Sequence, residues 1–164
     1  MAIGCFIAEN FLTFPLSVPF MRSLAAGASI LDMRFGYSLS SAYQLLDALG
    51  RSGRLDYLAE IWTVDLLLLA LFGLFLAAVI RRGVFRALYL VPILAAAFDY
   101  AENTAITILL VRYPVHSAIG VYIASGLTRV KLCLYAASIL MGVGGILVRS
   151  LKNAAPRRSR TTLM

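Results

Sequence analysis

Charged residues and paired cysteines are scarce in this sequence. Of its 164 residues, 14% are charged and 61% are hydrophobic, whereas soluble globular domains are about 25% charged and about 45–50% apolar. Cys5 and Cys133 lie within apolar stretches and form no C-x-x-C pair. These shortages exclude an ordinary soluble domain, a disordered chain, a disulfide framework and a paired-cysteine redox motif. The sequence contains no cofactor or metal-binding fingerprint, and we expect neither a cofactor nor a metal.

Acidic residues are also in the minority. The sequence has eight Asp and Glu residues and fifteen Lys and Arg residues, which gives a formal net charge of +7. In a soluble domain such an excess would indicate nucleic-acid binding. Here most of the cations flank apolar runs, where they serve as topology signals and contact lipid head groups. We therefore expect membrane lipids, and no nucleic acid, as partners.

Long apolar runs dominate what the sequence does contain. A membrane-crossing helix needs about 20 mainly apolar residues, and runs of that length recur along the chain. The sequence predicts an all-α, polytopic transmembrane helical bundle in one membrane-embedded domain, 1–148, followed by a basic tail, 149–164. We expect four spans, at residues 2–21, 59–80, 87–111 and 118–148.

Two segments before residue 59 are less regular than the later spans. Residues 2–21 contain Pro15 and Pro19, so a re-entrant or interfacial segment is the alternative to a first span. Residues 39–50 place apolar side chains at helical spacing, with a serine to cap the start and Gly50 to end the helix. This stretch is too short and too polar to span a membrane. It predicts an amphipathic helix between spans 1 and 2, on the membrane surface or against the bundle.

The distribution of cations predicts the orientation of the chain. The 81–86 connection carries three Arg and the tail carries five cations, with no acid in either. The positive-inside rule places both on the cytoplasmic or matrix side. We expect an integral protein of a bacterial inner membrane, or of an organelle membrane, with its C-terminus on that side. The expected lipid-head-group contacts are Arg51, Arg54, Arg81, Arg82 and Arg86.

Ionisable residues inside the predicted spans are the most informative feature. Asp99, Glu102 and Asn103 are spaced i, i+3, i+4, so they share one helix face at or beyond the membrane midplane. Each buried charge costs about 2.5–3.5 kcal/mol on insertion scales, and partners are therefore expected. An antiparallel hairpin would pair Glu102 with Arg129 and Asp99 with Lys131. The whole predicted intramembrane polar cluster is Glu9, Asp65, Asp99, Glu102, Asn103, Arg129 and Lys131.

Two interpretations of this cluster stay open on the sequence alone. In the first, Arg129 and Lys131 reach the outer head groups and the acids only pin helices together. In the second, Asp99, Glu102, Asn103 and Arg129, with Asp65 as a further candidate, line a polar cavity that binds a ligand.

Three functions follow from these observations. The leading hypothesis is a non-catalytic accessory or assembly subunit that packs against other integral membrane subunits. The alternative is a small membrane enzyme acting on a lipid-like or isoprenoid substrate, with Asp99 and Glu102 as acid/base candidates oriented by Asn103 and Arg129. The third is a homo-oligomer that conducts protons or small solutes.

Overall fold

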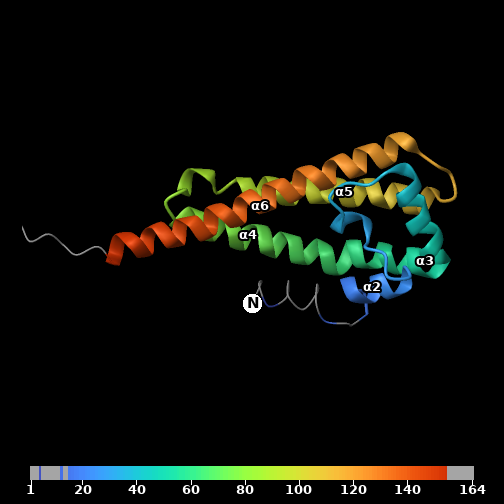
Figure 1. Ribbon diagram of the computed structural model, residues 1–164, viewed down its shortest axis with the longest axis horizontal. Helices are drawn as coiled ribbons and strands as arrows, with labels where there is room; N and C mark the ends of the chain where they lie inside the picture. The colour runs from blue at the N-terminus through green and yellow to red at the C-terminus, as the bar shows by residue number, and fades with distance from the viewer. Residues whose placement is uncertain (1–3, 5–11, 13–14, 155–164) are drawn as a thin grey trace, which may run out of the picture.

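The computed structural model describes residues 4, 12 and 15–154, and the regular elements of this part are all helical (Figure 1). The all-α prediction is confirmed. The elements are α2 (Val18–Leu24), η1 (Leu31–Met33), α3 (Leu39–Glu60), η2 (Ile61–Asp65), α4 (Leu66–Arg82), η3 (Arg86–Leu88), α5 (Val91–Arg112) and α6 (Ala118–Ala154).

Three helical stretches are long and apolar enough to cross a membrane: Leu39–Arg82, Arg86–Arg112 and Ala118–Lys152. Their long helices α4, α5 and α6 lie side by side along the long axis of the molecule (Figure 1). This is consistent with a membrane location and with three of the expected spans. Most of the expected span at 2–21 lies outside the described residues, and a fourth span stays a prediction.

Small residues let the long helices approach closely. A Cβ atom added to Gly73 of α4 would lie 3.2 Å from the carbonyl oxygen of Pro92 and 3.3 Å from Cβ of Ala96, both in α5. A Cβ on Gly145 of α6 would lie 3.7 Å from Cα of Gly83, just after α4. The end of α6 and the basic α4–α5 connection therefore meet at one end of the bundle, as expected for segments on the same membrane side.

Helix α3 breaks at Gly50 but does not end there. Gly50 has φ +62°, a backbone conformation that is readily available to glycine and strained for other residues. The chain then resumes a helix and continues without a loop through η2 into α4. The helix that contains the expected span at 59–80 therefore begins well before residue 59. At the other end of the chain, α6 continues past residue 148 through Ala154.

The first half of α3 packs across one end of the three long helices (Figure 1). The apolar positions that the sequence assigned to one face, among them Ala42, Leu45 and Leu46, are buried there. Tyr43 ties this segment to the α5–α6 connection, because its hydroxyl donates to the carbonyl oxygen of Val115 at 3.0 Å. The same hydroxyl accepts from the backbone N–H of Ser117 at 2.9 Å.

We expect Tyr43→Phe to lower the free energy of unfolding by about 1–3 kcal/mol, because two backbone groups would lose their partner. Tyr122→Phe is the matched control, since Tyr122 is 72% exposed. Thermal unfolding of the purified protein in mild detergent measures both. Equal stability of Tyr43→Phe and the unaltered protein would contradict the assigned role.

Candidate functional site

A buried ion-pair triad joins α5 to α6. Nζ of Lys131 lies 2.7 Å from Oδ1 of Asp99 and 2.6 Å from Oε2 of Glu102. Both acids are fully buried and Lys131 is 5% exposed. The antiparallel register expected from the sequence thus pairs Asp99 with Lys131, and Lys131 does not reach out to the membrane surface. We call these three residues the Lys131 triad.

The expected pairing of Glu102 with Arg129 is wrong. Glu102 is instead bound by Lys131 and by the hydroxyl of Thr128. Thr128 and Lys131 are three residues apart and share one face of α6, whereas Arg129 is rotated by about 100° from Thr128. Arg129 is accordingly exposed, and its guanidinium packs beside Gly36 in the segment before α3.

The third residue of the predicted α5 face connects to the start of α4. Nδ2 of Asn103 donates to Oδ2 of Asp65 at 2.7 Å. Asn103 is fully buried, so this hydrogen bond holds the Asp65 carboxylate in place from behind. The spacing rule that placed Asp99, Glu102 and Asn103 on one face therefore describes the structure well.

A π-helical turn brings Glu60 and Asp65 to the same side of their helix. These residues are five apart and would diverge by about 140° in a regular α-helix. The η2 segment between them is a π-helix, in which backbone bonds connect residues five apart and side chains at that spacing diverge less than in an α-helix. This turn explains how Glu60, which the sequence places near the outer end of the span at 59–80 but outside the predicted cluster, joins the site.

The segment between α2 and α3 contributes another acid that the sequence analysis did not include. Asp32, in η1, is 4% exposed. The hydroxyl of Tyr57 donates to its Oδ1 at 2.7 Å and accepts from the backbone N–H of Leu31 at 3.0 Å. No local pattern indicates that this segment folds into the bundle.

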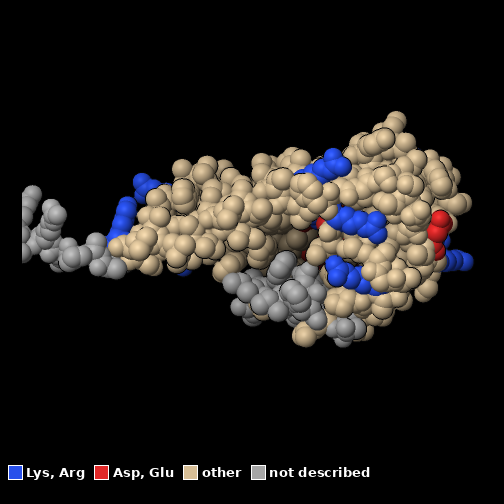
Figure 2. Space-filling model, viewed as in Figure 1, with Lys and Arg blue, Asp and Glu red and all other residues tan. Residues whose placement is uncertain are grey.

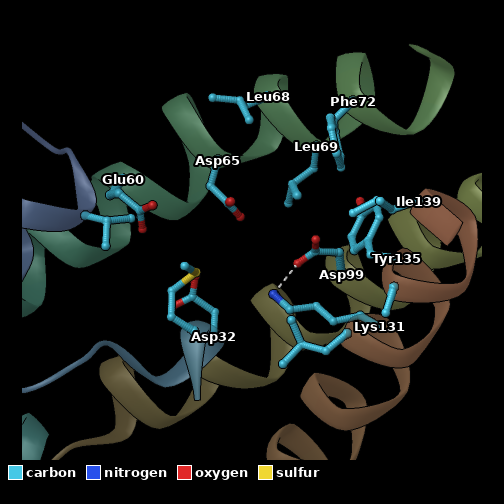
Figure 3. Close-up of a pocket in the computed structure, with 14 residues that line it drawn as sticks. Asp32, Glu60, Asp65, Leu68, Leu69, Phe72, Asp99, Lys131, Tyr135 and Ile139 are labelled. Atoms are coloured by element: carbon cyan, nitrogen blue, oxygen red, sulfur yellow. Dashed lines mark hydrogen bonds and ion pairs between the residues drawn. The ribbon is translucent and has the colours of Figure 1, made fainter. Parts of the chain in front are cut away.

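Asp32, Glu60 and Asp65, here called the carboxylate cluster, face one another across a cavity. Their nearest oxygens all lie within 4.8 Å of one another. The cavity has a volume of about 290 Å³ and is also lined by Asp99 and Lys131. Figure 3 shows these polar side chains pointing toward one shared space, and Figure 2 shows a hollow with acidic atoms at its edge.

The far side of this cavity is apolar. Its lining includes Leu68, Leu69, Phe72, Leu132 and Ile139 from α4 and α6. The cavity therefore joins a hydrocarbon-compatible wall to a strongly acidic one. Such an arrangement can receive an amphiphilic molecule, and its carboxylates can bind a cation, accept hydrogen bonds or transfer a proton.

Charge is not balanced within the site. The carboxylate cluster and the Lys131 triad contain five acids, and Lys131 is the one buried cation in the part of the chain that the structure describes.

At the edge of the spans, burial and then the nearby charge of Glu102 raise the pKa of the Tyr37 hydroxyl. Tyr37 thus remains protonated and does not add to the negative charge.

The remaining predicted site residues lie elsewhere. Glu9 falls outside the described residues. Arg51 is exposed, while Arg54 is half-buried, donates to the carbonyl oxygen of Leu46 at 2.8 Å and lies over the ring of Tyr113. The other three expected head-group contacts are exposed near the opposite end of the bundle: Arg81, Arg82 and Arg86.

We expect Lys131→Met to destabilise the protein by about 3–5 kcal/mol, because Asp99 and Glu102 would be left buried without their cation. Arg129→Met is the matched control, since Arg129 is exposed, and its effect should be small. Thermal unfolding in mild detergent compares the two. A larger loss for Arg129→Met than for Lys131→Met would contradict the observed pairing.

Comparison with protein-family models, curated proteins and solved structures finds no match for this chain.

Proposed function

We propose that this protein is a small membrane enzyme that binds a lipid-like or isoprenoid molecule in the cavity and acts on its polar group. The observation that supports this function best is the cavity itself, which has an acidic wall and an apolar wall within a bundle of membrane-length helices. A well-formed, largely apolar pocket with a few convergent polar groups is the usual form of a small-molecule site.

The two walls indicate the class of substrate. Leu69, Phe72 and Ile139 offer an apolar surface for a hydrocarbon chain, and the carboxylate cluster offers acceptors for a polar group of the same molecule. The volume of about 290 Å³ is near the lower end of ligand pockets, which run from about 300 to 1,000 Å³. The cavity therefore fits the polar group and the first part of a chain, and the rest would lie along the exposed apolar helix surfaces.

The two catalytic candidates have different positions and therefore different proposed roles. Asp99 lines the cavity and is the candidate that would touch the substrate and accept or donate a proton. Its Oδ1 is held by Lys131, while its Oδ2 makes no hydrogen bond of ordinary geometry with a described residue. Glu102 lies behind Lys131 and is a positioning residue, since it holds the lysine that holds Asp99.

The proposed setting is a bacterial inner membrane or an organelle membrane, with the C-terminus on the cytoplasmic or matrix side. The basic α4–α5 connection and the last turns of α6 support this orientation, because they lie at the same end and carry cations without acids. Arg81, Arg82 and Arg86 would contact lipid head groups there. The first half of α3 would then lie at the opposite, outer interface, and a first span at residues 2–21 would put the N-terminus on the cytoplasmic or matrix side.

We expect Leu69→Trp to reduce the amount of co-purified lipid by about tenfold or more, because the larger side chain would fill the cavity. Leu69 is 8% exposed and lines the cavity, whereas Leu71, two residues along α4, is 40% exposed and does not. Leu71→Trp is therefore the matched control. Purification in mild detergent, followed by mass spectrometry of protein and lipid, measures the bound molecule and any partner.

The same experiment tests the other functions. Co-purification of other membrane proteins at fixed stoichiometry, without bound lipid, would favour an accessory subunit and contradict the enzyme proposal. A symmetric homo-oligomer without lipid in the cavity would favour conduction. Equal lipid content in Leu69→Trp and Leu71→Trp would also contradict the proposal, since lipid would then bind elsewhere.

We expect Asp99→Asn to abolish conversion of the bound molecule, because an amide cannot exchange the proton that a carboxyl group can. The protein is incubated with a membrane lipid extract, and substrate loss is followed by mass spectrometry. Asp56→Asn is the control, since it makes the same substitution of an amide for a carboxyl group at a residue that does not line the cavity. Conversion at an unchanged rate by folded Asp99→Asn would rule out this acid/base role.

A further inference from the structure

We propose that Asp32, Glu60 and Asp65 bind one hard divalent cation, of the Mg²⁺, Mn²⁺ or Ca²⁺ class, at the acidic wall of the cavity. The site differs from the sequence-based expectation of no metal. The cation site deepens the proposed function. It rests on that function only for the effect of the cation on a substrate, because binding of the cation itself does not require lipid.

The geometry of the carboxylate cluster suits a single ion. The nearest oxygens of its three residues all lie within 4.8 Å of one another. Oxygens bind Mg²⁺ at about 2.0–2.1 Å and Ca²⁺ at about 2.3–2.6 Å, so two ligands on opposite sides of an ion are about 4.0–5.2 Å apart. An all-oxygen, carboxylate donor set favours these hard cations over Zn²⁺ or Cu²⁺, which prefer nitrogen or sulfur.

Two of the three ligands are oriented by hydrogen bonds from behind. Tyr57 donates to Oδ1 of Asp32, and Asn103 donates to Oδ2 of Asp65. One oxygen of each carboxylate is therefore held by the protein, and the second oxygen is available for an ion. Outer hydrogen bonds of this kind are typical of metal ligands, because they fix the direction of the carboxylate.

An independent feature of the cavity also points to a ligand. Asp99 is fully buried and comes from a different helix, α5. Its Oδ2 lacks a hydrogen bond of ordinary geometry within the described part of the chain, and the carboxylate points into the cavity that the cluster lines (Figure 3). The hydroxyl of Tyr135, which lines the same cavity, is a neighbouring protein donor, and water bound to a cation would supply a further donor to this carboxylate.

Charge favours a cation at this position. Four acids line the cavity and Glu102 lies behind Lys131, whose single positive charge is already shared between Asp99 and Glu102. A divalent ion would offset half of the four remaining formal negative charges. It would also keep coordination positions for water and for an oxygen atom of the polar group of a substrate, as Mg²⁺ sites built from few carboxylates commonly do.

The test is Mn²⁺ binding to the purified full-length protein in detergent, after removal of metals with a chelator. Electron paramagnetic resonance counts bound Mn²⁺, and thermal unfolding with and without Mn²⁺ reports stabilisation of the folded state. We expect about one bound ion per chain and a rise in unfolding temperature. We also expect Asp65→Asn and Glu60→Gln to weaken binding by about tenfold or more.

Asp56→Asn is the matched control, because it removes one acid from α3 that does not line the cavity. It should bind Mn²⁺ like the unaltered protein. Without metal, Asp65→Asn should unfold at a temperature equal to or above that of the unaltered protein, since one of the repelling carboxylates is gone. This second measurement separates loss of the site from loss of the fold.

Either of two results would overturn the proposal. One is that the folded, unaltered protein binds no Mn²⁺ up to about 1 mM, the range of the weakest protein Ca²⁺ sites. The other is that the cluster variants and Asp56→Asn bind equally well, which would show adsorption elsewhere. Lipid content is measured in the same samples. If Mn²⁺ binds and no lipid is found, the cation site is supported and the proposed function is contradicted. If lipid is found and no Mn²⁺ binds, the proposed function is supported and the cation site is contradicted.

Discussion

Burying charge inside a membrane protein is costly unless the charge is paired, and this constraint organises the bundle. Lys131 supplies one cation to two acids on the facing helix, at 2.7 and 2.6 Å. Because the three residues are buried, the contact specifies how α5 and α6 align along their length. The close approach of α4 to α5 at Gly73 and the Asn103–Asp65 hydrogen bond then place the third long helix against this pair.

The site depends on local departures from regular helix rather than on the helices alone. The π-helical turn η2 brings Glu60 and Asp65 closer to the same side of their helix, and the short η1 segment carries Asp32 into the bundle. The break at Gly50 folds the first half of α3 across the end of the bundle, while the second half presents Tyr57 to Asp32. Each departure adds an acid to the cavity or holds one in place.

A structural role and a proposed functional role meet in one residue, Asp99. One of its oxygens pairs with Lys131 and joins two helices, and the side chain also lines the cavity. The two interpretations that the sequence left open therefore do not exclude each other. The acids pin helices together, and some of them also line a space that can hold a ligand. Arg129 belongs to neither arrangement, since it is exposed and lies beside Gly36.

The sequence by itself determined the helical class, three membrane-length helices and the face shared by Asp99, Glu102 and Asn103, because hydropathy and helical periodicity are local properties of the chain. It also predicted the Asp99–Lys131 pair, since an antiparallel hairpin sets equal depths. Only the tertiary structure decided that Asp32 and Glu60 join the site. Periodicity arguments assume a regular α-helix, so they miss a π-helical turn, and no local pattern predicts which distant segments will converge.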